Sequence, residues 1–143
     1  QDNPNLFYLG MQDQFHTFNM FDAQAWYVRD IIMNKISLPS NDEMEKDINN
    51  WVSKEEALED AHQMIDFQTD YCVDLCSSID YPKIDFELIR KNFYEWEDHK
   101  EENILTYRDK SFPSPVTGTV GPSHHTTWLE AMDDSMQTYL KTK

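Results

Sequence analysis

Glycine is scarce in this sequence: only Gly10, Gly118 and Gly121 occur among 143 residues. They are too dispersed to form G-x-G-x-x-G or a P-loop, in which backbone N–H groups bind nucleotide phosphates. We therefore expect this chain alone to lack the usual phosphate-binding turns for a dinucleotide. No apolar run approaches the roughly 18 residues of a membrane helix. The N-terminus QDNPNLFYLG has no features of a secretory signal, which favours a cytoplasmic protein without membrane contact.

Basic side chains are also few. Twelve Lys and Arg oppose 27 Asp and Glu, which gives a formal net charge of -15. Such a surface repels polyanions, so nucleic acid is not an expected partner. We interpret the acidity, including the run from Glu95 to Glu102, as that of solvated helix faces.

Only two cysteines are present, Cys72 and Cys76. They are four residues apart in a predicted helix, so their side chains are neighbours. A zinc site would need two further ligands, and no C-x-x-C occurs. We interpret them as buried thiols in a helix seam, and we predict no metal site, either here or at the adjacent His124 and His125.

The segment Asn5 to Leu9, NLFYL, is short, apolar and aromatic, and it lies between Pro4 and Gly10. This pattern predicts a buried strand. A strand needs partners for its backbone donors and acceptors, and no other segment is strongly strand-like. We therefore expect the partner strands to lie outside this chain.

The remaining patterns are helical. A helix is predicted from about Phe18 to Lys35, with Thr17 as its cap and apolar residues at helical spacing (Phe18, Phe21, Ala25, Val28 and Ile32). Ser40 and Glu43 have the spacing of a capping box before a short helix through Trp51, and Ser53 and Glu56 repeat that signal.

The helix expected after Ser53 has a seam at steps of three and four residues, made of Leu58, Ala61, Ile65, Gln68, Cys72, Leu75 and Ile79. Asp85 is expected to cap a further helix, and residues 110–126, rich in proline and glycine, form an irregular arm before a terminal helix from Thr127. The fragment is thus predicted to be mainly α: one N-terminal strand, about five helices and an irregular arm.

The segment Gly10 to Trp26, GMQDQFHTFNMFDAQAW, combines a strand end, a polar turn and a helix start. A helix start presents backbone N–H groups and a partial positive charge, which stabilise an anionic or electron-rich ligand edge. Many α/β proteins share this arrangement without a ligand. The pattern alone leaves open both a ligand site and an ordinary turn with a cap.

This segment, continued by YVRDIIM, resembles the one that closes the flavin site in bacterial flavin-containing monooxygenases. NPNLFYLG resembles the last strand of that family's FAD domain. YEWEDHKEENILTYRDKSF and TGTVGPSHHTTWLEAMDDS resemble the C-terminal arm of the trimethylamine monooxygenase type. The resemblance covers nearly the whole chain and implies the C-terminal part of an α/β flavoprotein with two dinucleotide-binding domains.

The resemblance implies three regions. Residues 1–35 would form the last strand and flavin-site helix of the FAD-binding domain, residues 36–109 a helical C-terminal region, and residues 110–143 an irregular arm with a terminal helix. It also implies an activity: NADPH reduces FAD, oxygen adds to form a flavin C4a-hydroperoxide, and trimethylamine or a similar tertiary amine becomes its N-oxide. Proteins of this type are often homodimers.

By the same resemblance, Gln14 and Thr17 contact FAD, Asp13 and Phe15 line the substrate pocket, and Arg108 contacts NADP. Related enzymes commonly carry tryptophan at the position of Phe15, so the substrate range stays open. The alternatives are a turn amide for Gln14, a cap for Thr17, and an ion pair of Arg108 with a local acid such as Asp109.

The family's glycine-rich fingerprints and catalytic asparagine are not found in this chain. We therefore assign it no catalytic residue and expect it to be inactive alone. The competing hypothesis is an acidic, all-helical interaction module without a cofactor, in which the seam from Leu58 to Ile79 binds a partner. Two G-x-G-x-x-G motifs encoded upstream would favour the monooxygenase.

Overall fold

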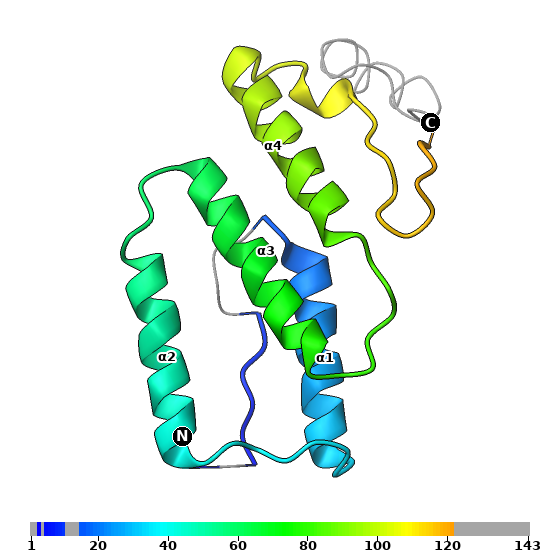
Figure 1. Ribbon diagram of the computed structural model, residues 1–143. Helices are drawn as coiled ribbons and strands as arrows, with labels where there is room; N and C mark the ends of the chain where they lie inside the picture. Colours follow the sequence, from blue (N-terminus) through cyan, green and yellow to red (C-terminus); the bar gives the residue numbers. More distant parts are fainter. Residues whose placement is uncertain (1–2, 4, 11–14, 122–143) are drawn as a thin grey trace, which may run out of the picture. The chain divides into compact units, whose positions relative to one another are not determined.

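The computed structural model describes residues 3, 5–10 and 15–121. It contains four α-helices and a short 3-10 helix (Figure 1): α1 Thr17–Ile32, α2 Asn41–Glu55, α3 Ala61–Ser77, α4 Phe86–Glu102 and η1 Tyr107–Asp109. The predicted mainly helical character is confirmed. Two compact units are present, Gln1–Lys83 with α1 to α3 and Ile84–Lys143 with α4 and η1. The helix expected from Thr127, and His124 and His125, lie outside the described residues.

The expected strand at Asn5–Leu9 is not formed. Within the described residues the only β pairing is an isolated antiparallel bridge between Pro113 and Val120. Leu6 and Tyr8 are 58% and 74% exposed. The physical reason is that an extended segment becomes a strand only when a neighbour satisfies its backbone groups, and no such neighbour lies in the part of the chain that the structure describes.

Helix α1 is confirmed, but both its cap and its buried face differ from the prediction. His16 is the N-cap and makes no side-chain capping bond, whereas Thr17 is already helical. The helix buries Met20, Ala23, Gln24 and Asp30. Phe18 and Ile32, from the predicted stripe, are instead 84% and 65% exposed. The helix therefore has apolar residues on a buried face and on an exposed face. The predicted stripe included residues of the exposed face.

The capping box of α2 is confirmed. The Glu43 N–H donates to Ser40 Oγ (3.3 Å), and the Ser40 N–H donates to Glu43 Oε2 (2.8 Å). The expected helix start at Ser53 is wrong, because α2 continues through Ser53 to Glu55. A cap side chain at Ser53 could act only if the backbone left the helix there. Instead Asp60 caps α3, accepting the N–H of Gln63 at 2.8 Å.

Helix α3 packs against both α1 and α2 (Figure 1). The predicted seam forms the inner face of α3, where Ile65, Gln68 and Cys72 are buried and Ala61 and Leu75 are half-buried. The two ends of the predicted seam, Leu58 and Ile79, lie outside the helix. From α2, Trp51 meets the rings of Phe67 and Tyr71 edge-on, with both centroid distances 5.4 Å. Apolar and aromatic burial of this kind is the main source of stability for helix packing.

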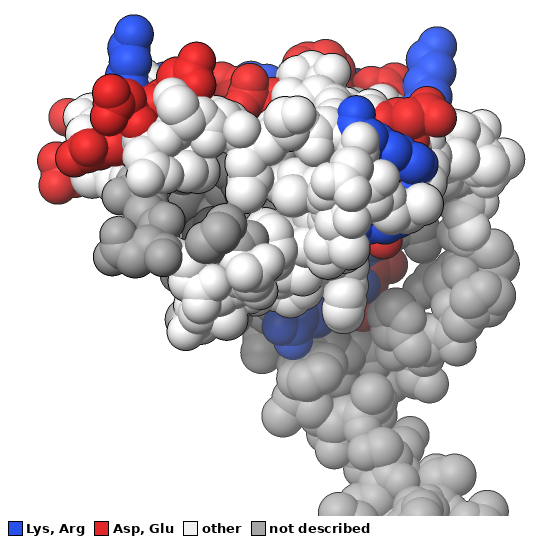
Figure 2. All heavy atoms as spheres, turned by 90° about the horizontal axis from the view of Figure 1, so that it is seen from below, with Lys and Arg blue, Asp and Glu red and all other residues white. Residues whose placement is uncertain are grey.

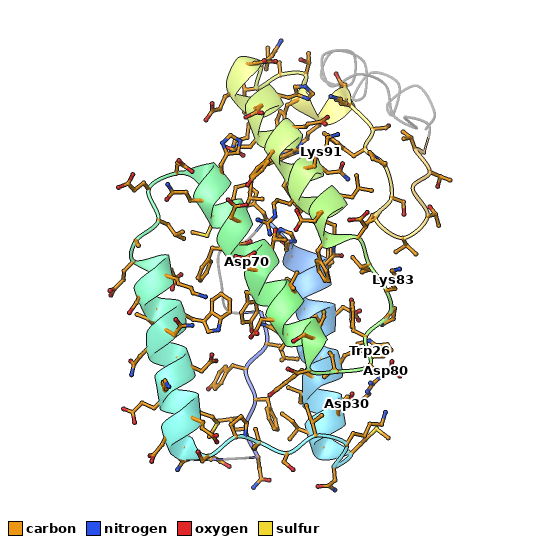
Figure 3. The ribbon with its side chains drawn as sticks, in the orientation of Figure 1. Trp26, Asp30, Asp70, Asp80, Lys83 and Lys91 are labelled. Atoms are coloured by element: carbon orange, nitrogen blue, oxygen red, sulfur yellow. The ribbon has the colours of Figure 1, made fainter. Side chains whose placement is uncertain are left out.

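A second set of contacts joins α1 to the segment after α3. Tyr81 Oη donates to Asp22 Oδ2 at 2.7 Å, and the Tyr81 ring meets Trp26 edge-on at 5.4 Å. Arg29 lies over the Trp26 ring and pairs with the buried Asp30 at 2.7 Å. Trp26 and Asp30 lie in the C-terminal half of α1 (Figure 3). These contacts hold the segment after α3 against α1.

In the second unit, Asp85 caps α4 as predicted, accepting the N–H of Leu88 at 2.9 Å. The Trp96 ring meets Tyr107 of η1 edge-on at 5.1 Å, and both Ile89 and Tyr107 are buried. Glu97 is buried and is paired with Lys100 at 2.8 Å. Asn92 Nδ2 donates to the Pro113 carbonyl at 2.9 Å, so the irregular segment after η1 is held on α4.

We predict that Ser40→Ala lowers the free energy of unfolding by about 1 kcal/mol, because it removes the cap. The Ser40 hydrogen bonds hold the pKa of Glu43 below its ordinary value. A carboxyl with a lowered folded pKa stabilises the fold above its unfolded pKa, and that contribution is lost as pH falls through the folded pKa. The difference between the two proteins in urea unfolding should therefore shrink in acid. Ser53→Ala, inside the same helix, is the control and should not destabilise.

The expectation of two buried thiols is confirmed for Cys72, whereas Cys76 is half-buried. We also predict that both cysteines are unreactive in the folded protein. Burial, and then the nearby Cys76, raise the pKa of Cys72 to about 12, and burial with Asp22 raises that of Cys76 to about 11. Thiolate is the reactive form, so disulfide-exchange reagents should react far more slowly at pH 8 than after unfolding. Rapid labelling of two thiols in the native protein would contradict the buried-seam interpretation.

Candidate functional site

The candidate site lies at the start of α1, where buried polar side chains hold the backbone. On one side, the Gly10 N–H donates to Gln24 Oε1 at 3.0 Å, and Gln24 Nε2 donates to Tyr71 Oη at 3.1 Å. Gln24 is buried, so its amide links residue 10 to α3 through the core of the first unit.

A second buried amide holds the residues immediately before the helix. Gln68 Oε1 of α3 accepts the N–H of Phe15 at 2.8 Å and, at 3.4 Å, the N–H of His16. Gln68 and His16 are only 2% and 1% exposed. A polar group buried without a partner costs free energy, and these bonds satisfy the amide oxygen and two backbone donors together.

The His16 ring is held by the same helix. Its Nε2 lies 3.1 Å from Thr69 Oγ1, and that hydroxyl donates to the Ile65 carbonyl at 2.7 Å. The bond to the carbonyl uses the single hydroxyl proton of Thr69. The oxygen must then accept from His16, so the proton lies on Nε2. A side chain at the N-cap is thus used to bind α3 instead of capping α1.

Gly10 is required by two features of its surroundings. Its φ of +72° is in the left-handed region, which is unfavourable for residues that carry a Cβ atom. A Cβ at this position would lie 2.3 Å from a carbon of the Phe21 ring. The predicted turn glycine therefore serves both backbone conformation and close packing on α1.

Of the four predicted flavin-pocket residues, the structure brings Phe15 and Thr17 together at the start of α1. Asp13 and Gln14 lie outside the described residues. The first turn of α1 has no acidic residue, and the N-cap residue His16 makes no side-chain capping bond. A helix start carries a partial positive charge, which stabilises the electron-rich edge of a ligand such as a flavin.

Arg108 belongs to the second unit, in η1. Its guanidinium lies 4.9 Å from the centroid of the Tyr107 ring, and Trp96 supports that ring from the other element. Lys100 Nζ lies 5.3 Å from the Trp96 ring centroid. Sequence reasoning selected Arg108 but not Tyr107 or Lys100, although three aromatic or basic residues in TYRDK were a usable signal. An exposed guanidinium supported on a ring can bind a phosphate or stack on a base.

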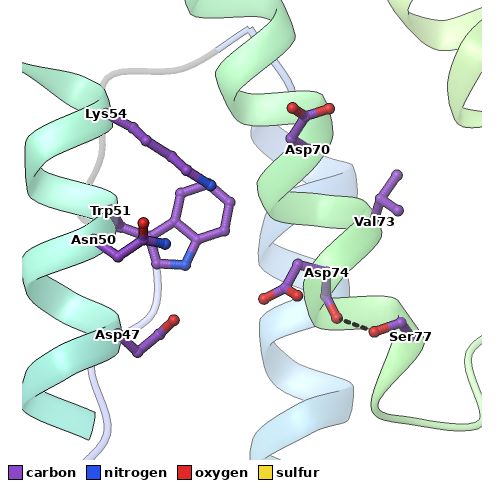
Figure 4. A pocket seen from close by; sticks show the side chains of 8 residues that line it. All are labelled: Asp47, Asn50, Trp51, Lys54, Asp70, Val73, Asp74 and Ser77. Atoms are coloured by element: carbon purple, nitrogen blue, oxygen red, sulfur yellow. Dashed lines mark hydrogen bonds between the residues drawn. The ribbon is translucent and has the colours of Figure 1, made fainter. Parts of the chain in front are cut away.

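Sequence reasoning also missed a hollow of about 390 Å³ between α2 and α3 (Figure 4). Asp47, Asp70 and Asp74 line it beside Trp51. Lys54 Nζ lies over the Trp51 ring at 4.3 Å, so the chain's own ammonium already uses the aromatic surface that would attract a cation.

The described residues were also compared with the requirements of a metal site and of a membrane-spanning helix. None of their His, Cys, Asp and Glu side chains forms a group of three placed to hold a metal ion. None of their helices is both long and apolar enough to span a bilayer.

Figure 2 shows one face on which charged side chains gather along an edge and uncharged ones cover most of the remainder.

Comparison with known proteins finds relatives that share most of this sequence. No protein-family model matches the chain. A trimethylamine monooxygenase from Pelagibacter sp. (strain HTCC7211) is 68% identical over 143 residues, which is 100% of this chain and 32% of that protein. One from Methylocella silvestris is 52% identical over 139 residues, covering 97% of this chain and 31% of that protein.

A solved structure gives the same result. The crystal structure of Tmm from Pelagibacter sp. strain HTCC7211 matches with a TM-score of 0.88 and 70% sequence identity, over 96% of this chain and 31% of that one. The chain thus spans about a third of the length of the relatives it matches. Over that third of their length, the chain is similar to the trimethylamine monooxygenases in both sequence and structure.

Proposed function

We propose that the chain is the C-terminal part of an FAD- and NADPH-dependent monooxygenase that converts trimethylamine to trimethylamine N-oxide. The observation that carries this proposal is 68% identity over the whole chain to a trimethylamine monooxygenase. In the reaction, one atom of O₂ goes to the amine nitrogen and the other to water, and NADPH supplies the two electrons. The chain alone, without the remaining two thirds, is inactive in this proposal.

We assign the start of α1 to one side of the flavin site. Thr17, as the first helical residue, and Gln14, beside it in sequence, would contact FAD. When bound, FAD would take a hydride from NADPH and activate oxygen. The residues of this chain would hold its polar edge by hydrogen bonds and by the partial positive charge of the helix start, where no acidic residue lies in the first turn.

Phe15 and Asp13 would line the substrate pocket. Phe15 is half-buried, and its backbone is fixed by Gln68. An aromatic wall attracts an alkylammonium, but oxygen transfer needs the neutral amine lone pair. Phe15 would therefore contribute shape and apolar contact to the reacting amine. It is smaller than the tryptophan expected from the resemblance, which makes room for other tertiary amines.

The exposed apolar residues of the first 35 positions support the assignment of residues 1–35 to the FAD-binding domain. Leu6, Tyr8, Phe18 and Ile32 are more than half exposed. A large apolar area of this kind commonly marks an interface. In the proposed enzyme, Asn5–Leu9 would pair as the last strand of a sheet supplied by the rest of the protein, and the outer face of α1 would pack on it.

The alternative interaction module receives no comparable support. It required the seam from Leu58 to Ile79 as a partner-binding face. The structure uses the centre of that seam internally, since Ile65 and Cys72 are fully buried against the first unit. A buried seam cannot also be a free binding surface.

The protein's activity tests the proposal directly. The full-length protein carrying this chain should purify with FAD, and trimethylamine should stimulate its NADPH oxidation with one N-oxide formed per NADPH consumed. Product is measured by mass spectrometry. The 143-residue chain purified alone should show no flavin absorbance. A full-length protein without flavin, or without amine-dependent NADPH oxidation, would refute the proposed function.

For Arg108, we predict that Arg108→Ala in the full-length enzyme raises the KM for NADPH roughly tenfold with little change in kcat, which corresponds to about 1.4 kcal/mol of lost binding. Arg108→Lys should lie between, because it keeps the charge but not the planar group. Lys91→Ala, an exposed cation on α4, is the matched control. An unchanged KM in Arg108→Ala would leave this residue a purely structural role.

A further inference from the structure

Gln68 is the one polar side chain in the predicted seam of α3, and the structure gives it a specific role. Its Oε1 accepts the N–H of Phe15 at 2.8 Å and that of His16 at 3.4 Å, from more than 50 residues away in sequence. The side chain is 2% exposed. It therefore contacts the backbone at the junction where the predicted pocket residue Phe15 leads into α1.

The neighbouring contacts act on the same junction. Thr69, the next residue of α3, holds the ring of His16 at 3.1 Å, while Gln24 holds Gly10 at 3.0 Å and is itself bonded to Tyr71 of α3. Three side chains from the core of the unit thus fix residues on both sides of positions 11–14. A leucine at position 68 would fill a similar volume, but it would leave the two N–H donors without this acceptor.

We propose that Gln68 is a positioning residue of the monooxygenase: through the backbone of Phe15 and His16, it sets the place of the Phe15 ring and of the first turn of α1, which begins at Thr17. This rests on the proposed function. Gln68 acts by orienting groups that contact the flavin and the amine, and it does not itself take part in the chemistry. Displacement of such groups by about 1 Å is enough to lower turnover by up to about a hundredfold.

The test uses the full-length enzyme and three variants. Gln68→Leu removes the acceptor, and Gln68→Glu keeps an oxygen at the same reach. Ile65→Ala damages the core one turn earlier on α3 but leaves the side chains that bond Gly10, Phe15 and His16 in place. For each, we would measure the melting temperature, the dissociation constant for FAD, the visible circular dichroism of bound flavin, and the hydrogen exchange of the Phe15 and His16 amides.

Gln68→Leu should weaken FAD binding roughly tenfold or more, alter the flavin dichroism and speed exchange at both amides. Gln68→Glu should restore FAD binding to within roughly threefold of the unmodified enzyme, because a carboxylate also accepts two N–H bonds. Ile65→Ala should lower the melting temperature but leave FAD binding and exchange at Phe15 unchanged.

Two results would overturn the positioning role while leaving the proposed function intact. One is a Gln68→Leu enzyme with normal FAD affinity and dichroism. The other is an Ile65→Ala enzyme whose FAD affinity falls as much as that of Gln68→Leu, since general destabilisation would then explain both. An unmodified enzyme that binds no FAD would instead overturn the proposed function and, with it, the role of Gln68.

Discussion

The first unit depends on the need to satisfy backbone N–H groups that are removed from water where the chain turns into α1. Residues just before a helix cannot use the helix's own carbonyls. Here that requirement is met by Gln24 and Gln68, whose amide oxygens accept from Gly10 and from Phe15 with His16. Both amides are buried, and a hydrogen bond is electrostatically stronger in such a low-dielectric interior than in water. An amide oxygen or a backbone N–H left unpaired there would cost free energy. The positions of Phe15 and of the start of α1 at Thr17 follow from this arrangement.

The second constraint is the exposed apolar surface of the same region. A helix usually has one face for the core and another for water, but α1 has Met20 and Ala23 inside and Phe18 and Ile32 outside. The relatives matched by this chain are about three times as long. In the proposed enzyme, the outer face of α1 and the extended segment before it would pack against that additional polypeptide.

How much the sequence could predict depended on whether the signal was local. Ser40 with Glu43, and Asp85, were correctly predicted as caps because a cap is satisfied within four residues. The α3 seam was also correct at Ile65 and Cys72, since one apolar stripe dominates that helix. Ser53 failed because a cap signal is also compatible with a helix interior, and α2 runs through Ser53 to Glu55.

The site was less predictable for a related reason. Thr17 and Phe15 were selected by resemblance, but nothing local indicates that Gln68 of α3 accepts the N–H of Phe15 or that His16, not Thr17, is the N-cap. The placement of Gly10 has a consequence for sequence divergence. Space and backbone conformation both demand a residue without a side chain there, so replacing Phe21 by a smaller residue would relieve only the first demand. Homologues that keep this turn should retain the glycine even where the aromatic ring beneath it has drifted.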